Sequence, residues 1–397
     1  MKIKIRIPDW MLSPWVMGLV VLAAVGILIS LVRMVVGIGP VSNLNDAYPW
    51  GFWISFDIYT GVALGAGAFT MAAVVYIFDL KKFTPLVRPS VLTGFLGYAM
   101  VAVALLVDLG RPENIWHMII YQNHTSFLFE IGICVMTYLT VLLLEFIPVI
   151  FEGFRWNGLV HFFHKWLTLP LVILGVVLST LHQSSLGSLT IIMPSKLHPL
   201  WWTPFIPILF FVSAVIVGFA MVILESQLSA RAFNRGIEIN LLKLVASWIP
   251  YGSGLYLLLR FGQLAVEGKL GYLFTSGYYS LLFWTEILLL GVIPIVLFSQ
   301  KKVRESPNGL LYGSLSVVLG VVLNRFDVSW IALGGRIFDT TGYVPSIFEV
   351  LVSFGLVAAS VLVFRYIALH FPLFVDEEEF EEQETAYERA HPAKAGD

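Results

Sequence analysis

Charged residues are scarce in this sequence, and their scarcity excludes most kinds of soluble protein. Only 13% of the 397 residues are Asp, Glu, Lys or Arg, and 58% are hydrophobic, whereas a soluble domain usually carries about 25% charged residues. The Lys and Arg residues stand in short clusters between apolar runs and form no basic face that could follow a phosphate backbone. We therefore expect a membrane protein that has no nucleic-acid partner.

Cysteine is almost absent, and histidine is rare inside the apolar runs. The single cysteine, Cys134, lies within such a run, where we expect a small buried side chain, and one thiol cannot form an iron–sulfur or zinc site. A b-type haem in a helical bundle usually needs facing histidine ligands. Only His182 lies within a run; the other seven histidines, at 117, 124, 161, 164, 198, 370 and 391, lie in loops, near run ends or in the tail. We therefore expect no metal, no iron–sulfur cluster and no haem.

Long apolar runs dominate what is present. A membrane-spanning helix needs about 20 apolar residues, and such runs occur at 15–37, 53–79, 88–108, 126–151, 166–188, 204–228, 240–262, 278–299, 308–326 and 346–369. Lipid offers no hydrogen bonds to an open backbone, and the runs are too long for barrel strands, so they must be helices. The first run is too long for a signal peptide and lacks a cleavage site. The predicted fold is an all-α polytopic membrane protein with about ten transmembrane helices.

The basic residues predict the orientation of these spans. The N-terminus, alternate loops and the C-terminal end together hold 17 of the 24 Lys and Arg residues. By the positive-inside rule, this side is cytoplasmic, so both termini are predicted to be cytoplasmic and the protein to lie in a bacterial inner membrane. Acidic residues contribute little to the rule, and the acidic tail, 372–397, is expected to be a solvated end.

A weak internal repeat predicts how the spans are grouped. The run 126–130 and the run 280–286 both begin with Ser and end with Glu just inside the predicted periplasmic end of a span. We therefore expect two four-helix bundles in parallel orientation, spans two to five at 53–188 and spans six to nine at 204–326. The first span, within 1–52, and the last, at 346–371, would flank them.

The predicted periplasmic loops are poor in charge and rich in tryptophan. The tryptophans are Trp50, Trp53, Trp116, Trp201, Trp202 and Trp330. An aromatic belt at the membrane interface explains most of them. The alternative is a docking surface for another protein, because Trp and Tyr are efficient interface anchors.

Ionisable residues inside spans are the best guide to function, because they are expensive in lipid and are usually functional or paired. Asp57, Asp108 with Arg111, Glu130, and His182 with Gln183 all fall near the predicted periplasmic end of spans two to five. We expect a shared pocket at this level. The alternative is that these side chains snorkel to water, although Asp and Glu are too short to do so well.

Asp57 and His182 each have a possible chemical role and a possible purely structural role. Asp57, Gly61 and Gly65 are spaced by four and share a helical face that can approach a flat ligand or simply another helix. His182 is the candidate for proton transfer, because imidazole titrates near neutrality, but it can equally be a structural hydrogen-bonding residue. Nearer the cytoplasm, Glu145 and Glu225, with Glu286 at intermediate depth, form a candidate proton relay unless each is paired locally.

Several short motifs resemble one membrane-protein family. They are PWGFWISFD at 49–57, PLVRP at 85–89, DLGR at 108–111, FE at 129–130, HQSSLGS at 182–188, HPLW at 198–201 and LRFG at 259–262. Their order and spacing resemble the NrfD/polysulfide-reductase (PsrC-like) membrane subunits. Within that family they are most similar to the HybB type, the membrane subunit of periplasm-facing nickel-iron uptake hydrogenases. DLGR is closer to the wider family, since HybB-type chains often have Asp-Val-Gly-Arg.

The resemblance implies a quinone-reactive subunit of a respiratory oxidoreductase complex. It implies that electrons come from a periplasmic ferredoxin-like iron–sulfur subunit, with hydrogenase small and large subunits beyond it, and reduce menaquinone or a similar quinone. Asp57, Glu130 and His182 would then be the proton-transfer and hydrogen-bonding groups, and Asp108 and Arg111 would shape the pocket mouth. The rival functions are a secondary transporter, which broken helices at the membrane midplane would favour, and a purely structural anchor for a periplasmic enzyme.

Overall fold

The computed structural model describes residues 13–45, 50–333 and 343–374, and within these ranges ten helices are long and apolar enough to span a membrane. Spans one to five consist of α1 (Pro14–Val36), the series η3 (Ile54–Thr60), α2 (Gly61–Leu64), α3 (Gly67–Ala72) and η4 (Ala73–Ile77), then α4 (Thr84–Asp108), α6 (Phe127–Gly153) and α8 (Thr168–Ile191). All five predicted spans are confirmed. The third begins earlier than predicted, because its Pro85 occupies the first turn, where the missing N–H is tolerated.

The second half of the chain forms the other five spans. Spans six to ten are α9 (Ile206–Phe233), α10 (Ile239–Val266), the series α12 (Tyr278–Ile287), η8 (Leu288–Val292) and α13 (Ile293–Ser299), then α15 (Pro307–Phe326) with η9 (Asp327–Ile331), and α17 (Ile347–His370). Short helices α5 (His117–Ile120), α7 (Asn157–Phe162), α11 (Tyr272–Thr275) and α14 (Lys301–Arg304) lie in the connections. The predicted all-α class and its ten spans are therefore confirmed in the described residues.

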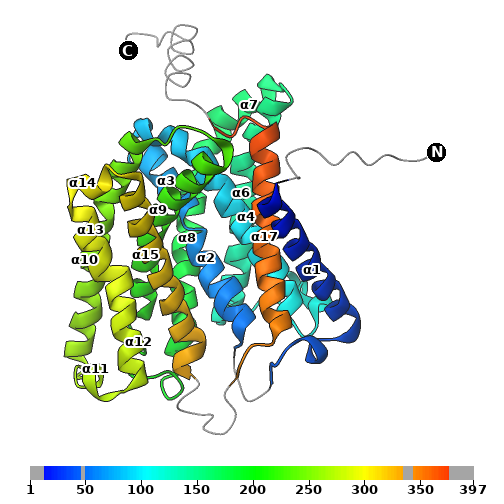
Figure 1. Cartoon of the computed structure of the whole chain (residues 1–397). Coiled ribbons are helices and arrows are strands. Elements are labelled where there is room, and N and C mark those ends of the chain that lie inside the picture. The colour runs from blue at the N-terminus through cyan, green and yellow to red at the C-terminus, as the bar shows by residue number, and fades with distance from the viewer. Residues whose placement is uncertain (1–12, 46–49, 334–342, 375–397) are drawn as a thin grey trace.

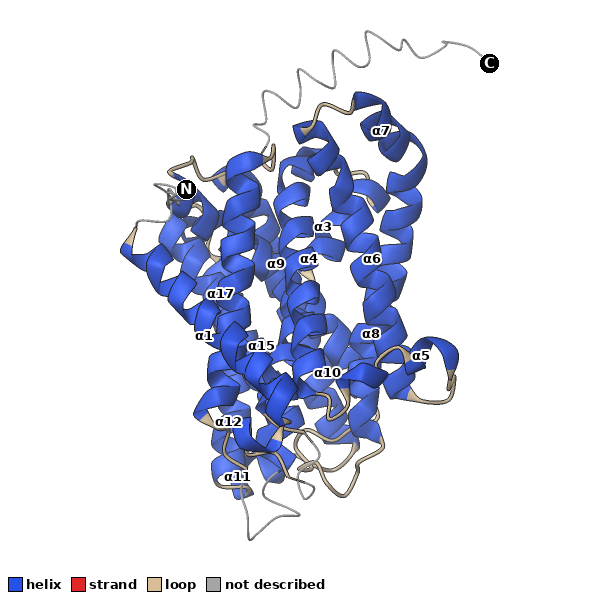
Figure 2. Cartoon of the chain, turned by 90° about the vertical axis from the view of Figure 1, so that its right-hand side faces the viewer, coloured by secondary structure: helices blue, strands red, loops and turns tan. Residues whose placement is uncertain are grey.

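The helices pack as two rings of four. Span two contacts α4 and α8, and α6 contacts both α4 and α8, which closes the first ring; α9, α10, α13 and α15 close the second. Helix α9 also packs against α3 and α8, so it joins the two bundles. Helices α1 and α17 pair beside the first bundle, with α17 against α4, as Figures 1 and 2 show.

Span two is irregular, but it is not unwound. Its first seven residues form a π-helix that contains Asp57, and a two-residue turn at Gly65 and Ala66 separates α2 from α3. The hydrogen-bond ladder nevertheless continues, because the N–H of Gly65 donates to Gly61 at 3.0 Å and that of Thr70 donates to Ala66 at 3.2 Å. This span therefore lacks the exposed backbone that a transporter's broken helix presents, whereas π segments often occur at functional sites.

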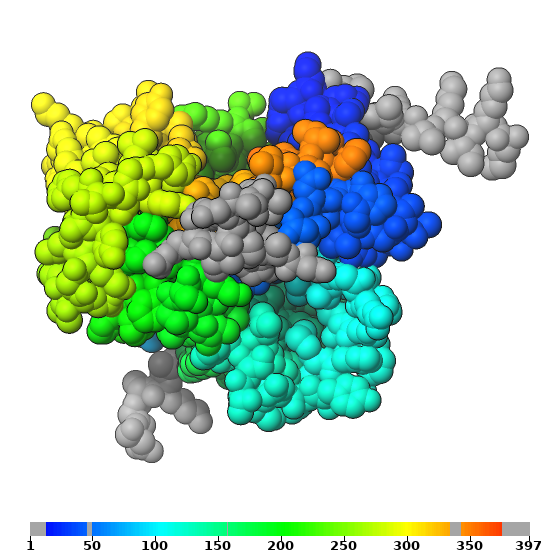
Figure 3. Space-filling view, turned by 90° about the horizontal axis from the view of Figure 1, so that it is seen from below, coloured from blue at the N-terminus to red at the C-terminus, as the bar shows by residue number. Residues whose placement is uncertain are grey.

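Two ends of the molecule differ in composition. We call the end that carries α7 and α14 the basic end, because Arg88, Lys301 and Lys302 lie there, and the opposite end, with α5 and α11, the aromatic end. Figure 3 views the aromatic end and shows segments from both bundles side by side. Helix α1 begins and α17 ends at the basic end. The predicted cytoplasmic location of this end stays a prediction, and residues 1–12 and the acidic tail from 375 onward lie outside the described residues.

The prediction of an interfacial aromatic belt is wrong for two tryptophans. Trp53 is 1% exposed and Trp201 is fully buried. The indole N–H of Trp53 donates to the carbonyl of Glu349 at 3.1 Å, and that of Trp201 donates to Glu286 at 2.8 Å. These residues anchor helices inside the protein. Trp116, which is 49% exposed, remains consistent with the belt or with a docking surface.

The pairing of α1 with α17 depends on two facing glycines. A Cβ atom at Gly26 would lie 2.7 Å from the Cα of Gly355, closer than side chains allow, so the two backbones are in direct contact. Close approach at small residues is the usual basis of helix association in lipid, where there is no hydrophobic drive between helices. Much of the rest of α1 faces outward, as Leu28 and Leu31 do.

We therefore expect Gly26→Leu to separate α1 from α17 and to lower the thermal midpoint of the detergent-solubilised protein. Gly18→Leu is the matched control, because it lies on the same helix and a Cβ there meets nothing within 4 Å. A thermal-shift assay on both variants tests this. Equal midpoints for the two variants would show that the glycine contact does not hold the helices together.

Candidate functional site

His182 lies at the centre of the first bundle and is fully buried. Its Nε2 atom lies 2.5 Å from the Tyr98 hydroxyl, and its Nδ1 atom lies 2.6 Å from the carbonyl oxygen of Leu178. A carbonyl can only accept, so Nδ1 carries the hydrogen and Nε2 accepts from Tyr98 in a neutral ring. The Leu178 carbonyl therefore fixes the tautomer of His182, and the ring's Nε2 atom is turned towards Tyr98 of α4.

The residues after His182 connect α8 to its neighbours. The amide of Gln183 donates to the carbonyl of Val62 at 2.8 Å, and the hydroxyl of Ser185 donates to the Glu130 carboxylate at 2.6 Å. About one turn of α8, residues 182–185, thus engages α2, α4 and α6. Helical spacing puts residues 182, 183 and 185 on neighbouring faces, so a single segment can reach three helices.

Asp57 faces away from this segment, towards α17. Its Oδ2 atom accepts a hydrogen bond from Ser353 at 2.7 Å, and its Oδ1 atom is buried without a hydrogen-bond partner. A buried carboxylate oxygen without a donor is unfavourable, and in native proteins it often marks an unseen water, ion or ligand. Asp57 shares this incomplete bonding with Gln183 and Glu225, each of which also has a buried side-chain oxygen without a hydrogen-bond partner.

Asp108 and Arg111 do not form one unit. Asp108 is half-buried and interacts electrostatically with Arg33 of α1, whereas Arg111 is exposed. The buried guanidinium of Arg33 donates to the carbonyl of Leu109. Asp108 thus faces the α1 side of the bundle, beside the start of α17.

The start of α17 is fastened to span two by Glu349, which is fully buried. Its carboxylate accepts from the backbone N–H of Asn43 at 2.8 Å and of Ser346 at 3.0 Å, and from the hydroxyl of Tyr343. With the Ser346 side chain on the Glu349 N–H, this is a capping box. The bonds fix the height of Ser353, one turn further along, against Asp57.

We expect Glu349→Ala to destabilise the protein by about 1–3 kcal/mol, because it leaves buried donors unpaired. The control is Glu113→Ala, which removes an exposed carboxylate at the same end of the molecule. Thermal unfolding of the two variants in the same detergent measures the difference. A Glu349 variant as stable as the control would contradict the assigned role.

The structure therefore divides the predicted pocket in two. Glu130, His182 and Gln183 are brought together through α8, whereas Asp57 and Asp108 lie on the α1–α17 side of the bundle. The side chains of Asp57, Glu130 and His182 have separate partners and do not bond to one another. Gly61 stands between these two regions: a Cβ there would lie 2.9 Å from Val101 of α4, so this glycine permits close packing.

The three candidate relay acids lie in separate surroundings. Glu286 accepts from Trp201 and from the Tyr256 hydroxyl, each at 2.8 Å, so it is paired within the second bundle. Glu225 lines a cleft beside α17. Glu145 lines a cavity of about 60 Å³ near the basic end. A single relay through all three receives no support from their contacts.

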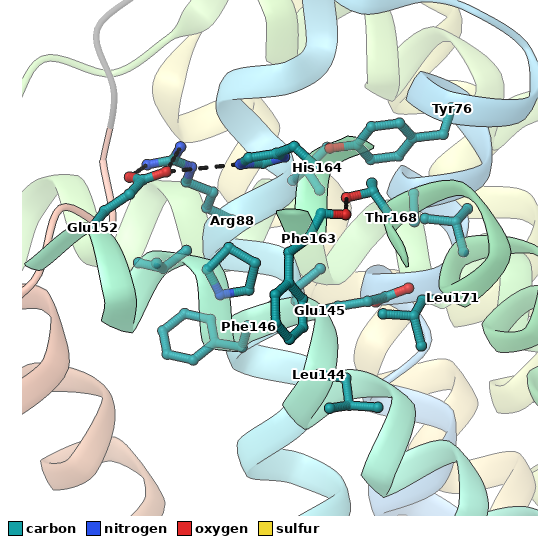
Figure 4. Close-up of a pocket in the computed structure, with 16 residues that line it drawn as sticks. Tyr76, Arg88, Leu144, Glu145, Phe146, Glu152, Phe163, His164, Thr168 and Leu171 are labelled. Carbon is teal, nitrogen blue, oxygen red and sulfur yellow. Dashed lines mark hydrogen bonds and ion pairs between the residues drawn. The ribbon is translucent and has the colours of Figure 1, made fainter. Parts of the chain in front are cut away.

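Figure 4 shows the cavity that contains Glu145. Arg88 forms two hydrogen bonds to the Glu152 carboxylate, at 2.8 and 2.9 Å, and His164 lies 3.9 Å from the same group. These partly exposed side chains stand at one side of the cavity, with Glu145 deeper in the bundle. A volume of about 60 Å³ holds about four waters at roughly 15 Å³ of accessible volume each.

Several residues of the site were not identified from the sequence. Tyr98 and Ser353 are uncharged residues in apolar helices, and nothing in a single sequence marks them as partners of His182 and Asp57. Ionisable residues inside membrane spans are usually functional or paired. Applied to every span, this rule would also have identified three buried residues, Arg33, Arg325 and Asp327.

The surroundings of His182 and the spacing of potential metal ligands can be compared with what a haem or a metal ion requires. Among the described residues, no three His, Cys, Asp or Glu side chains come close enough to hold a metal ion. Both ring nitrogens of His182 are engaged, by Tyr98 and by the backbone, and its ring is flanked by Tyr98 and Tyr138 with centroids 5.4 Å away. An axial haem ligand needs a free ring nitrogen facing the iron.

Comparison with known proteins identifies the relatives of this fold. The family model described as polysulphide reductase, NrfD, matches residues 40–332. The chain belongs to the NrfD family. Over 86% of its length it is 34% identical to the probable Ni/Fe-hydrogenase 2 b-type cytochrome subunit of Escherichia coli, covering 87% of that protein. It is also 29% identical to the menaquinone reductase integral membrane subunit of Nitratidesulfovibrio vulgaris, over 86% of this chain and 87% of that one.

A further relative in Nitratidesulfovibrio vulgaris is 38% identical over 91% of this NrfD-family chain and 95% of its own length. The resemblance drawn from the motifs is thus confirmed at the level of the family. The Escherichia coli relative is named a b-type cytochrome subunit, so the expectation that this chain holds no haem stays a prediction that rests on the engaged nitrogens of His182.

Proposed function

We propose that this chain is the quinone-reactive membrane subunit of a respiratory oxidoreductase complex in a bacterial inner membrane. One named relative is a menaquinone reductase subunit and another a hydrogenase subunit. The observation that carries the proposal is the buried Asp57 carboxylate with one unpartnered oxygen, in the same bundle as the His182–Tyr98 pair. These are acid–base groups without a partner ion, inside an apolar protein.

The proposed reaction is the two-electron reduction of menaquinone or a similar quinone. Two electrons arrive from an iron–sulfur subunit docked at the aromatic end, and two protons are added to the ring oxygens to give the quinol. Asp57, which has an unpartnered carboxylate oxygen, supplies a hydrogen bond and a proton to the quinone, His182 delivers protons through its contact with Tyr98, and Glu130 with Ser185 positions α8. The expected partners are a ferredoxin-like subunit and hydrogenase small and large subunits, on the side where Trp116 and Tyr121 are exposed.

Buried hydroxyl groups in the first bundle support a path by which protons could reach His182. Tyr138 and Ser179 are buried, and their hydroxyls lie near each other and near Tyr98 without forming a hydrogen bond of good geometry. The Tyr138 ring lies against those of Tyr98 and His182, with centroids 4.8 and 5.4 Å away. Unpartnered buried hydroxyls usually bind internal water. We therefore place a water between Glu145 and His182, and we infer that protons enter from the basic end.

Gly175 keeps the space below Tyr138 open. A Cβ at this position would lie 3.4 Å from the Tyr138 ring and 3.6 Å from the Glu145 carboxylate, so the glycine of α8 faces both residues. The inferred order is the cavity of Figure 4, Glu145, a water at Tyr138 and Ser179, Tyr98, and His182. Glu225 and Glu286 are not needed in this path.

We expect Asp57→Asn and His182→Gln to lower quinone reduction about 100- to 10,000-fold, the usual contribution of a positioned acid or base. Both variants should still assemble, since each substitution nearly preserves size. The assay is donor-driven quinone reduction by the purified complex, with Asp79→Asn, an exposed acid at the basic end, as the control. Retained turnover in both variants would remove the two residues from the mechanism.

The proton path predicts a different phenotype for Glu145→Gln and Tyr138→Phe. Turnover should fall and proton uptake from the basic side should be lost, while quinone binding stays unchanged. Proton uptake measured in oriented vesicles during quinone reduction tests this, and Glu225→Gln serves as the control. Normal uptake from that side in the Glu145 variant would show that the protons come from elsewhere.

A purely structural anchor for a periplasmic enzyme is the alternative function, and it predicts no effect of these substitutions on electron transfer. If the chain only holds a partner at the membrane, no substitution at Asp57 or His182 should alter electron transfer, provided that the complex assembles. The same assay therefore separates the two functions.

A further inference from the structure

A cleft of about 310 Å³ lies between α2, α4, α9 and α17, away from the His182 segment. Gly61, Gly65 and Gly97 form part of its wall. Leu228 and Val361 also line it and are 53% and 41% exposed, so the cleft opens sideways towards lipid. Its volume is within the range of about 300–1,000 Å³ that is usual for small-molecule sites.

Two polar atoms in the cleft, the Thr93 hydroxyl and the Oε1 atom of Glu225, are buried without a hydrogen bond, although the Glu225 carboxyl also interacts with Ser229. Both residues also line a smaller adjoining cavity, so they lie on neighbouring walls. Leu64, Met221 and Leu224 make the lining beside them apolar, and Ser229, Ser360 and Arg365 also line the cleft. An apolar slot with a few convergent polar groups is the usual form of a ligand site.

The depth of these groups indicates what kind of lipid would occupy the cleft. Glu225 lies eight residues before the end of α9, or about 12 Å along the helix axis at 1.5 Å per residue. The 28 residues of α9 span about 42 Å, against about 30 Å of hydrocarbon, so Glu225 lies roughly 6 Å inside the apolar layer. A phospholipid has only acyl chain at that depth.

An acyl chain would leave the carboxyl and the hydroxyl unpaired, which is unfavourable in an apolar medium. A ring with a carbonyl oxygen would accept from both groups. The glycine wall favours a flat shape, because the nearest atom to a Cβ built at Gly97 is the Cα of Gly65 at 4.0 Å and no side chain projects there.

We propose that this cleft binds a quinone-class molecule, with its ring against the glycine wall and a carbonyl oxygen between the Thr93 hydroxyl and the Glu225 carboxyl group. Asp57 does not line the cleft, and Thr93 and Glu225 lie towards the basic end, away from the docking side of the electron donor. The cleft binds its ligand without reducing it, and it does not rest on the function proposed above.

The test uses the complex in lipid nanodiscs with an azido-naphthoquinone that carries a short isoprenoid chain. After illumination, mass spectrometry should find the label on the cleft residues of α9 and α17, between 221 and 229 and between 357 and 361. Gly97→Leu fills the slot and should lower this labelling at least about tenfold, as expected when a fitted site is sterically blocked. Gly254→Leu, a matched substitution in open space on α10, should not.

Thr93→Val keeps the shape of the slot and removes one donor, so labelling should fall about threefold to tenfold, the effect of one hydrogen bond. This variant decides the question if Gly97→Leu does not fold. The cleft should still be labelled in Asp57→Asn and in His182→Gln, even if these variants no longer reduce quinone. Loss of the cleft label and loss of quinone reduction are therefore separate results, and each tests a different proposal. Two results would overturn the proposal. One is a label found only near the aromatic end. The other is that extraction of the wild-type protein releases phospholipid and no quinone, and that this phospholipid is lost in Gly97→Leu.

Discussion

Lipid offers no hydrogen bonds, and this one constraint determines where the polar side chains of the protein lie. A carboxyl, imidazole or hydroxyl group within the hydrocarbon layer must find its partner on another helix or bind water inside the protein. His182 with Tyr98, Glu130 with Ser185, Asp57 with Ser353 and Glu286 with Trp201 are all such pairs between helices. Each one fixes both the rotation and the height of the helices that it joins.

The incomplete pairs are therefore more informative than the complete ones. Most polar groups in the first bundle are satisfied, and the exceptions are Asp57, Thr93, Tyr138, Ser179 and Gln183, with Glu225 of the neighbouring α9. They occur at the α17 side of span two, on the inner faces of α6 and α8, and in the lateral cleft. Because unpaired groups destabilise a protein, their survival indicates that water or a ligand occupies these places. Proton transfer and quinone binding both require such openings.

The two bundles use similar sequence positions in different ways. Glu130 and Glu286 stand at matching places in the weak repeat, yet Glu130 meets a serine of α8 whereas Glu286 meets Trp201 and Tyr256. In the second bundle, buried Arg325 donates to Ser213 and lies over the ring of Phe210. The first bundle holds acid–base groups near a lipid-facing cleft, and the second holds arginines in its interior. This difference favours the first as the site of quinone chemistry.

The class of the protein, its ten spans and its family could be predicted from the amino-acid sequence, because they depend on the length of apolar runs and on local motifs. Asp57 and His182 were also predicted in this way, since ionisable residues in lipid are rare. The folded arrangement was needed to show that Asp57 faces Ser353 and not His182, that Trp53 and Trp201 are buried anchors, and that Glu145, Glu225 and Glu286 lie apart. The physical reason is that depth in the membrane can be counted along the chain, whereas the direction of a side chain depends on how each helix is rotated against neighbours that are distant in sequence.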